Sequence, residues 1–372
     1  MEYTYLKDVC NITMGQSPES SSYNEDGDGV PFFQGNADFG EIYPCVRVWS
    51  NEPKKMASAN DILISVRAPI GALNYAKEDC CIGRGLAAIT PSSRVNLKYI
   101  YYLLKAKKSE LNSKGTGSTF KAIGKSVLEE TLVPVLSIKE QNDIVSKIEC
   151  VEEIIRKRHV QIEELDNLIK SRFVEMFGKC TTSVRLGDCC EVHARIGWQA
   201  LTKNEHMKTG DYMLVTGTDF KSGEINYSTC VHVAKERYEM DKHIILKNDD
   251  VLITKDGTIG KVAIVHNLPK PATLNAGVFV VRPDERFNKD YIANVFKGPL
   301  FSDYVEASKT GATIKHLNQK HLVEFMIPVP SLIEQESFAE FVNHVTKLKF
   351  EVQKSLDETQ ILMDSLMQQY FG

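Results

Sequence analysis

Apolar residues recur at alternating spacings of four and three along two long segments of the chain. The first run extends from Ile144 to Met176 and the second from Phe338 to Tyr370. This heptad pattern is typical of helices that pair along a shared seam, and we favour such a pair over two independent surface helices. The seam positions are Ile148, Val151, Ile155, Ile162, Leu165, Ile169, Val342, Val345, Val352, Leu356, Met363 and Leu366. Polar residues interrupt the pattern at Arg158, Arg172, Lys349 and Thr359.

Both segments begin and end with the same signals. In each, a serine stands three residues before a glutamate, which is the spacing of a capping box at a helix start. The pairs are Ser137 with Glu140 and Ser331 with Glu334. Each segment closes on Phe-Gly, and glycine commonly follows the last residue of a helix. We therefore expect helices over 137–178 and 331–372, each about 40 residues or roughly 60 Å long.

Outside these segments the pattern changes to short apolar runs separated by Gly- and Ser-rich stretches. Runs of this length are typical of strands in β-rich domains. The expected strands include Asp61–Val66, Leu86–Thr90, Asp250–Thr254 and Val278–Val281. Short helices are expected at Lys98–Lys107 and Lys289–Phe296.

The motifs of the first half return in the same order in the second half. Gly117–Lys121 returns 194 residues later as Gly311–Lys315, and Ser137–Gln141 returns as Ser331–Gln335. A repeat this long indicates two domains with pseudo-two-fold symmetry, not a solenoid. The helix that leaves the first domain leads into the second, so the helices pair most simply antiparallel. The predicted fold is α+β, with β-rich globular domains at 1–136 and 179–330 and helices at 137–178 and 331–372 that form an antiparallel coiled coil.

Composition indicates in which cellular compartment the protein is found and whether it has disulfides. Among the 372 residues there is no run of about 18 apolar residues, so we expect no membrane span, and Met1 leads directly into a polar segment without a signal-peptide pattern. The nine cysteines are scattered and form no C-x-x-C motif, which indicates reduced thiols and a cytoplasmic protein.

Charge is distributed unevenly along the chain. The net charge is −4. The two helical segments hold 10 Lys/Arg and 16 Asp/Glu, whereas the remainder holds 35 and 33. The globular domains could therefore each carry a local basic face for nucleic acid, although ordinary charge scatter would give the same totals.

Signals for catalysis are weak. Gly124-Lys125-Ser126 resembles the end of a phosphate-binding loop, but the required earlier glycine position holds Thr119. The sequence has no G-x-S-x-G, no H-E-x-x-H and no glycine-rich S-adenosylmethionine loop, and the histidines do not cluster at ligand spacing. We expect a chain that is not itself an enzyme and that holds no metal.

The order of motifs resembles the specificity subunit of type I restriction-modification enzymes over essentially the whole chain. The motifs are Gly15–Pro18, Arg67–Gly71, Thr116–Lys121 and Pro134–Gln141, and the last two return in the second half as Thr310–Lys315 and Pro328–Gln335. The resemblance implies that domains 1–136 and 179–330 are target-recognition domains, each reading half of a bipartite site in double-stranded DNA. It implies that the helices are spacers that dock two methyltransferase subunits, with restriction/translocase subunits in the full complex. S-adenosylmethionine, ATP and Mg²⁺ would then be used by the partner subunits.

Residue type gives the candidates for DNA contact. Base edges are read by Arg, Lys, Asn and Gln, and phosphates are held by Lys, Ser and Thr. Candidates for DNA contact are Gln16, Ser17, Gln34, Asn36, Arg67 and Arg84 in the first domain and Arg195, Trp198, Gln199, Lys255, Thr258, Lys261 and Asn275 in the second. Phosphate candidates are Ser118, Thr119, Lys121, Thr313 and Lys315. Arg84, between two glycines, and Trp198, in a polar loop, are the strongest of these.

The second domain departs from the motif of the first. It has Lys255–Thr258 where the first has Val66–Pro69, as two different half-sites would require. Two other classes stay open: an assembly scaffold that does not read DNA, and the recognition part of a related methyltransferase system. A fused methyltransferase fragment is disfavoured because the sequence has no N-P-P-[YF] motif.

Overall fold

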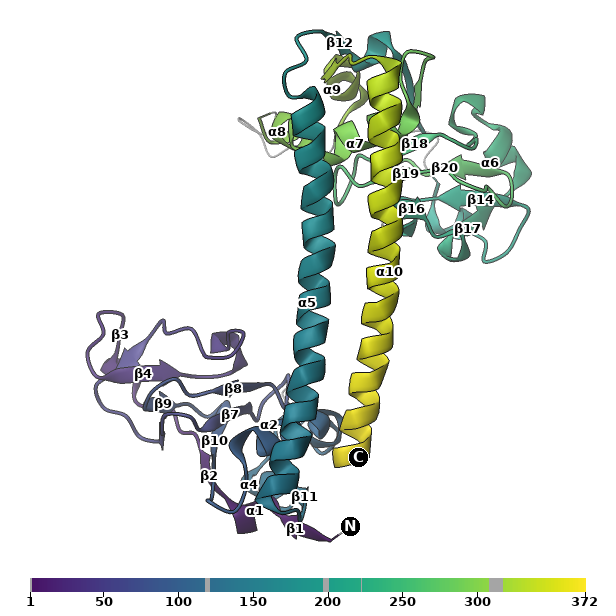
Figure 1. Cartoon of the computed structure of the whole chain (residues 1–372). Coiled ribbons are helices and arrows are strands. Elements are labelled where there is room, and N and C mark those ends of the chain that lie inside the picture. Colours follow the sequence, from purple (N-terminus) through teal and green to yellow (C-terminus); the bar gives the residue numbers. More distant parts are fainter. Residues whose placement is uncertain (1, 118–120, 197–200, 222, 308–316) are drawn as a thin grey trace. The chain divides into compact units, whose positions relative to one another are not determined.

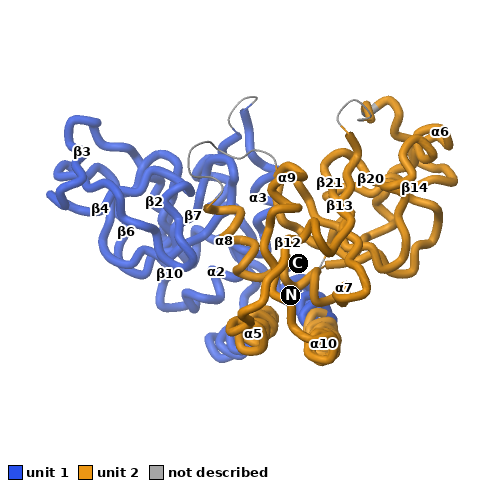
Figure 2. The backbone as a smooth tube through the Cα atoms, turned by 90° about the horizontal axis from the view of Figure 1, so that it is seen from above, with its two compact units in different colours: residues 1–159, 354–372 blue, residues 160–353 orange. Residues whose placement is uncertain are grey.

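The chain forms short strands, short helices and two helices of 40 residues each. The computed structural model describes residues 2–117, 121–196, 201–221, 223–307 and 317–372. The chain divides into two units, coloured separately in Figure 2: unit 1 comprises residues 1–159 and 354–372, and unit 2 comprises residues 160–353. The unit boundaries fall inside the long helices, so each of these helices belongs in part to both units.

The described residues of unit 1 form three sheets. A four-stranded antiparallel sheet has the order β2 (Cys10–Met14), β10 (Leu86–Pro91), β7 (Ile62–Ser65), β8 (Leu73–Tyr75). A five-stranded sheet has the order β3 (Tyr23–Asn24), β5 (Trp49–Ser50), β4 (Val30–Phe33), β9 (Cys80–Ile82), β6 (Met56–Ala57). A two-stranded sheet joins β1 (Tyr3–Tyr5) to β11 (Leu132–Pro134). The short helices are α1 (Leu6–Val9), α2 (Leu97–Ala106), α3 (Lys108–Ser113) and α4 (Lys125–Glu129).

Unit 2 follows a similar plan (Figure 1). Its four-stranded antiparallel sheet has the order β13 (Cys190–Ala194), β21 (Val278–Pro283), β18 (Val251–Thr254), β19 (Val262–Ile264). Its other sheets are β17 (Val231–Val233), β14 (Tyr212–Val215), β20 (Ala272–Leu274), then β15 (Phe220–Lys221) with β16 (Glu224–Ile225), and β12 (Ser183–Arg185) with β22 (Met326–Pro328). The short helices are α6 (Lys235–Glu239), α7 (Lys289–Lys297), α8 (Pro299–Ala307) and α9 (Gln319–Glu324).

The strands and short helices expected from the sequence are present. The four expected strands correspond to β7, β10, β18 and β21, and the two expected short helices to α2 and α7. Each unit mixes helices with mainly antiparallel sheets, which confirms the α+β class. Within the described ranges, no helix is long and apolar enough to cross a membrane. All nine cysteines are free thiols.

The central strands are apolar throughout because each lies between two cores. Successive side chains of a strand point to opposite faces of the sheet. In β7, Ile62 and Ile64 pack with the helices of unit 1, whereas Leu63 packs with Phe33 and Ile82 of the five-stranded sheet. A strand that is covered on both faces reads as a continuous apolar run. The strand β18 of unit 2 is divided between two cores in the same way.

The two long helices are α5 (Ile138–Phe177) and α10 (Leu332–Phe371), drawn in teal and yellow in Figure 1. Both predicted capping boxes are formed. The Glu140 backbone N–H donates to Ser137 Oγ at 3.3 Å, and the Ser137 N–H donates to the Glu140 carboxylate at 2.8 Å. Ser331 and Glu334 repeat this exchange at 3.4 and 2.8 Å. The carboxylates also receive the serine hydroxyls, and these bonds lower the pKa of Glu140 and of Glu334.

Within unit 2 the long helices run antiparallel. Phe177, the last residue of α5, packs edge-on against Phe338 near the start of α10, with ring centroids 5.3 Å apart. Farther from that end, the Lys349 ammonium of α10 lies 2.6 Å from the Asp166 carboxylate of α5. A polar interruption of the apolar stripe is therefore an ion pair between the two helices.

The predicted seam is only partly buried. The buried members are Ile148, Val151, Val342, Val345, Leu356 and Met363, and the half-buried members are Ile155, Ile162, Leu165, Ile169, Val352 and Leu366. Ile148 and Val151 pack into the core of unit 1 among Tyr99, Ile100 and Leu103 of α2. The globular part of the unit thus covers much of the apolar stripe that the sequence suggested for a partner helix.

Candidate nucleic-acid interface

In unit 1, loops that are distant in sequence meet at one edge of the sheets. The strands β4 and β9 are parallel neighbours, with Phe33 paired to Ile82, so the residues that follow them leave the sheet together. The Gly83 N–H donates to the Phe33 carbonyl at 2.8 Å, and the Gly85 N–H donates to the Gln34 carbonyl at 3.2 Å. The Val66 N–H, just beyond β7, donates to the Gly85 carbonyl at 2.9 Å. These bonds fix the loops that carry Gln34, Arg84 and Arg67 against one another.

Glycine on both sides of Arg84 is required by this close packing. A Cβ atom on Gly85 would lie 2.4 Å from the Gln34 carbonyl oxygen, which is far below van der Waals contact. On Gly83 it would lie 3.0 Å from the Gln34 Cα and 3.1 Å from Ser17 Oγ. The backbone of this loop therefore packs directly against the loops that carry Gln34 and Ser17. Arg84 is the one long side chain between the two glycines.

These loops surround a cavity of about 390 Å³. It is lined by four of the predicted DNA-contacting residues, Gln34, Asn36, Arg67 and Arg84, together with Arg47, Asp38 and Ser65. The structure thus brings together side chains that are up to 50 residues apart in the sequence.

The arginines of this cavity differ in their partners. Arg47 forms an ion pair with Asp38 and donates to the Ala37 carbonyl at 2.9 Å. Arg67 and Arg84 are exposed, and within the described part of the chain neither guanidinium has a hydrogen-bond or ion-pair partner. A free guanidinium presents paired N–H donors that match a guanine edge or a phosphate.

The remaining candidates of unit 1 lie around this edge. Gln16 is exposed, and its backbone N–H donates to the Ile82 carbonyl at 2.9 Å. Ser17 Oγ accepts from the Arg84 N–H at 3.4 Å. Lys121 has an exposed side chain, and its carbonyl accepts from the Ala68 N–H at 3.1 Å, which places it beside the Arg67 loop. Ser118 and Thr119 lie outside the described residues.

The loop of unit 2 that corresponds to the Arg67 loop has a similar backbone conformation but different side chains. Gly71 and Gly260 both have left-handed backbones, with φ of 84° and 85°, and donate to the carbonyls of Ser65 and Thr254 at 2.9 and 3.0 Å. Counted from these residues, the position of Arg67 is taken by Asp256. In the loops after the parallel strands β9 and β20, the position of Arg84 is taken by Ala276.

The candidates of unit 2 are more dispersed. A cavity of about 430 Å³ is lined by Arg195, Lys255, Asp256, Asn318 and Gln319, among others. The Lys255 ammonium lies 5.1 Å from the centre of the Phe279 ring. Thr258 and Lys261 are exposed, and Asn275 is half-buried with its Oδ1 accepting from the Ala276 N–H at 2.6 Å. Trp198, Gln199, Thr313 and Lys315 lie outside the described residues.

The prediction that Arg195 contacts DNA is wrong. Its side chain is 1% exposed. Nε donates to the Leu274 carbonyl at 2.8 Å and Nη2 to Thr273 Oγ1 at 3.1 Å, so Arg195 ties the end of β13 to β20. Burial lowers the pKa of this guanidinium. A residue type that suits DNA contact does not by itself reveal such a role inside the domain.

Some residues that line the cavities are not among the candidates predicted from the sequence. Arg47 stands in a stretch without a repeat signal, and Asn318 and Gln319 follow the T-G-[SA]-T-x-K motif. Asp256 could have been found from the sequence, because the Ile-Gly pair that follows its loop is present in both halves.

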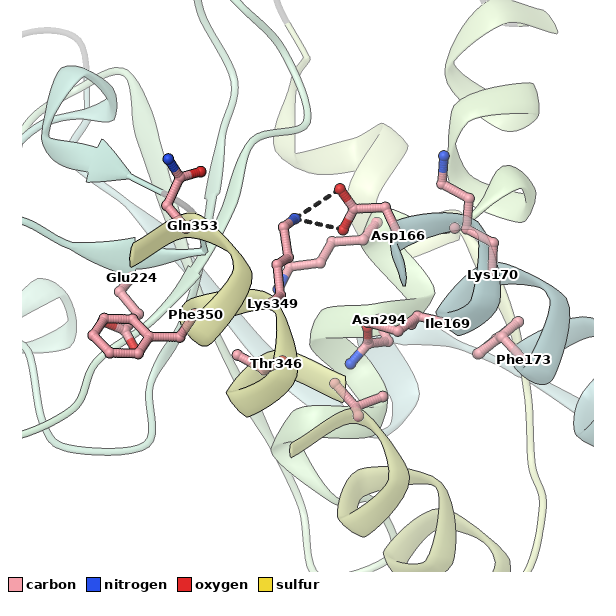
Figure 3. A pocket seen from close by; sticks show the side chains of 13 residues that line it. Asp166, Ile169, Lys170, Phe173, Glu224, Asn294, Thr346, Lys349, Phe350 and Gln353 are labelled. Carbon is pink, nitrogen blue, oxygen red and sulfur yellow. Dashed lines mark hydrogen bonds and ion pairs between the residues drawn. The ribbon is translucent and has the colours of Figure 1, made fainter. Parts of the chain in front are cut away.

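Each unit has a second cavity beside the long helices. In unit 2 it measures about 440 Å³ and has an apolar wall of Ile169, Phe173 and Val342. The Lys349 ammonium donates to both oxygens of Asp166, at 2.6 and 2.7 Å. Figure 3 shows this pair, with Phe350 at the next position of α10. Phe350 lines this cavity and is 67% exposed.

The corresponding cavity of unit 1 measures about 890 Å³. Its lining includes Met363 and Met367 at the repeat positions of Ile169 and Phe173, and Ile155 at the position of Lys349. The polar residues of the two cavities differ more than the apolar ones. In unit 1, Glu152 accepts a hydrogen bond from Tyr102 Oη at 2.6 Å and forms an ion pair with Lys105 at 2.6 Å. The two cavities therefore share an apolar wall and differ at the rim.

Comparison with known proteins gives a consistent assignment. The family model described as "Type I restriction modification DNA specificity domain" matches residues 1–164 and again residues 181–359. A putative type I restriction enzyme MjaX specificity subunit from Methanocaldococcus jannaschii is 45% identical over 157 residues, which is 41% of this chain and 37% of that protein. The EcoBI specificity subunit from Escherichia coli is 21% identical over 98% of this chain and 83% of its own length.

Among solved structures, the S subunit of a type I restriction-modification system from M. genitalium has a similar fold, with a TM-score of 0.54 and 18% identity over 100% of this chain and 96% of that one. The family model matches both repeats, and together the matches cover most of the chain. The chain therefore belongs to the type I restriction-modification DNA specificity family.

Proposed function

We propose that this chain is the DNA-recognition subunit of a type I restriction-modification complex and reads a bipartite, asymmetric target. The observation that carries the proposal is the cavity of unit 1, where Arg67 and Arg84 present guanidiniums that have no partner among the described residues, beside Gln34 and Asn36. Donor and amide side chains of these types read base edges in the major groove. The domains 1–136 and 179–330 are the target-recognition domains in this proposal, each reading one half-site.

Different chemistry at equivalent loop positions supports two different half-sites. The two units share the backbone frame around Gly71 and Gly260, yet Asp256 and Ala276 stand where Arg67 and Arg84 stand in unit 1. An arginine donates to a guanine edge, whereas a carboxylate accepts from a cytosine amino group. Two loops with a similar backbone and different side chains would recognise different bases, as an asymmetric target requires.

The long helices supply the docking surface in this proposal. The segments 137–178 and 331–372 form an antiparallel coiled coil that separates the recognition domains, and the twin cavities beside it each receive one methyltransferase subunit. The support is that both repeats keep an apolar wall at the same positions, Ile169 with Phe173 and Met363 with Met367, while the rims differ. Restriction/translocase subunits would join in the full complex, and S-adenosylmethionine, ATP and Mg²⁺ would be used by those partners.

A domain exchange tests the recognition role. Residues 1–136 are replaced by the equivalent domain of a related protein, and the methylome of a host that expresses the complex is sequenced. We expect one half of the methylated motif to change and the other half to stay. The reciprocal exchange of 179–330 is the control and should change only the other half. If both halves change together in either exchange, the domains do not read independently. A complex that assembles but shows no sequence preference in binding would favour the scaffold alternative.

A further inference from the structure

We propose that unit 1 reads two G·C base pairs of its half-site, one through Arg67 and one through Arg84. The inference rests on the proposed function and adds the base identity to it. It concerns only the cavity lined by Gln34, Asn36, Arg67 and Arg84, which we name the arginine cavity.

The backbone beneath both arginines is held rigidly. Arg84 lies between Gly83 and Gly85, whose N–H groups are bonded to the Phe33 and Gln34 carbonyls. The Arg67 carbonyl accepts from Ser65 Oγ at 2.7 Å, and Arg67 forms an isolated bridge with Ala122. A specific contact needs its donor in a defined place, and a fixed backbone under a long side chain provides one.

The two guanidiniums are available for a base edge. Guanine presents O6 and N7 side by side in the major groove, and bidentate donation by arginine is the commonest specific contact to it. Arg67 and Arg84 have no partner within the described residues, whereas Arg47 in the same cavity is already committed to Asp38 and the Ala37 carbonyl. Arg47 thus differs from Arg67 and Arg84 in being paired within the protein.

Phosphate binding is the competing role for these arginines, and the repeat argues against it. A phosphate contact carries no sequence information, so it suits both half-sites alike. The sequence keeps lysine at such a position in both repeats, as Lys121 and Lys315. Arg67 and Arg84 are instead replaced by Asp256 and Ala276. Residues that change between two recognition domains on a common frame are expected to be the ones that distinguish the bases.

The test uses the complex assembled with its methyltransferase subunits. The wild-type target is first read from the methylome, and duplexes are made in which each base pair of the target is replaced in turn. Binding and methylation of this set are measured for Arg67→Gln and Arg84→Gln. We expect each variant to lose discrimination at one G·C pair, at a different position for each, by roughly 5- to 150-fold. Every other position should keep its preference.

Three further variants serve as controls. Arg94→Gln should leave the preference unchanged at every position, because Arg94 does not line the arginine cavity and donates to the Asp8 carbonyl at 2.8 Å. Arg84→Lys should keep a preference for guanine, since lysine also donates to O6 and N7. Lys121→Ala should weaken binding to all duplexes alike and flatten the slope of log affinity against log salt by about 0.9.

Specific outcomes would overturn the assignment. It is wrong if Arg67→Gln and Arg84→Gln weaken all duplexes equally, as Lys121→Ala is expected to do, or if discrimination is lost at an A·T pair. It is also wrong if the wild-type half-site of unit 1 contains fewer than two G·C pairs. These results leave the proposed function intact, because the target would still be bipartite. A loss of discrimination in the half-site of unit 2 would instead count against independent reading itself.

Discussion

At the scale of single residues, the Glu-Gln pair that is repeated at the start of both long helices has a structural explanation. Gln141 and Gln335 follow the capping glutamates and are buried, at 1% and 0% exposed. Gln335 Oε1 accepts from the Asn288 N–H at 2.8 Å, and its amide donates to the Arg286 and Pro330 carbonyls at 3.0 Å. Gln141 binds the Asn96 N–H and the Leu136 carbonyl in the same way. Each glutamine thus fastens the start of a long helix to the start of a short one.

Replacing Gln335 should therefore destabilise unit 2. Gln335→Ala removes three hydrogen bonds from a fully buried site and leaves the partner groups unsatisfied, so we expect a loss of about 2–4 kcal/mol in the free energy of unfolding. Chemical denaturation of the chain measures this. Gln360→Ala on the same helix is the matched control, because Gln360 is exposed and bonds only Asp364. Equal stability of the two variants would show that the buried network contributes nothing.

The cysteines should separate into two reactivity groups. Burial raises the pKa of Cys10, Cys80 and Cys230 to about 12, so almost none of these thiols is ionised at pH 8, and the thiolate is the reactive form. Cys45 and Cys150 are exposed. Treatment of the native protein with iodoacetamide at pH 8, followed by peptide mass spectrometry, should modify Cys45 and Cys150 and spare the buried three. Unfolding in denaturant should make all five react. Modification of Cys230 in the native protein would contradict its burial.

At the scale of elements, each long helix ends inside a core built largely by other parts of the chain. Phe177 at the end of α5 packs against Tyr291 of α7, with ring centroids 5.0 Å apart. Phe371 at the end of α10 packs against Tyr99 of α2 at 5.2 Å. The Phe-Gly pair that closes each repeat is thus an anchor. A Cβ atom on Gly178 would lie 2.5 Å from the Val174 carbonyl oxygen, which explains the glycine.

The exposed ring on α10 gives a prediction about assembly. Phe350 lines the cavity of unit 2 and is 67% exposed, so a charge there should oppose an apolar partner surface. We expect Phe350→Glu to yield complexes with one methyltransferase subunit instead of two, measured by native mass spectrometry. Ile361→Glu on the same helix is the control, because Ile361 is 69% exposed but does not line either of the two cavities. Two bound subunits in the Phe350→Glu complex would remove this cavity from the docking surface.

Some elements could be predicted from the sequence, and others could not. Long heptad helices and four-residue apolar strands have a period that can be recognised, and their ends carry capping signals. The two-residue strands β3, β5 and β6 are too short to show a period. The arginine cavity could be predicted only as separate candidates, because hydrogen bonds between Gly83, Gly85 and their neighbours bring its loops together. The burial of Arg195 could not be predicted, because nothing in its local sequence shows the carbonyl and hydroxyl that its guanidinium binds.

At the scale of the whole chain, the length of the helices should set the spacing of the target. The pairing of Asp166 with Lys349 inside unit 2 implies that the heptad 163–169 of α5 lies opposite the heptad 346–352 of α10. Deleting both heptads shortens each helix by about 10 Å, or roughly three base pairs of DNA. We expect a folded complex whose methylated motif keeps both half-sites and has a gap that is shorter by about that amount. Methylome sequencing of the deletion variant checks this, and an unchanged gap would remove the spacer role.

Unit 1 is interrupted in sequence, since residues 354–372 complete a core begun by residues 1–159. Met363 and Phe371 belong to that core, and they are translated only after the whole of unit 2. At roughly 5–20 residues per second, the intervening 194 residues occupy a ribosome for on the order of 10–40 s. The first unit to emerge is thus the last to be finished. During that interval the apolar surface around Tyr99 lacks Met363 and Phe371, which complete its core in the finished unit.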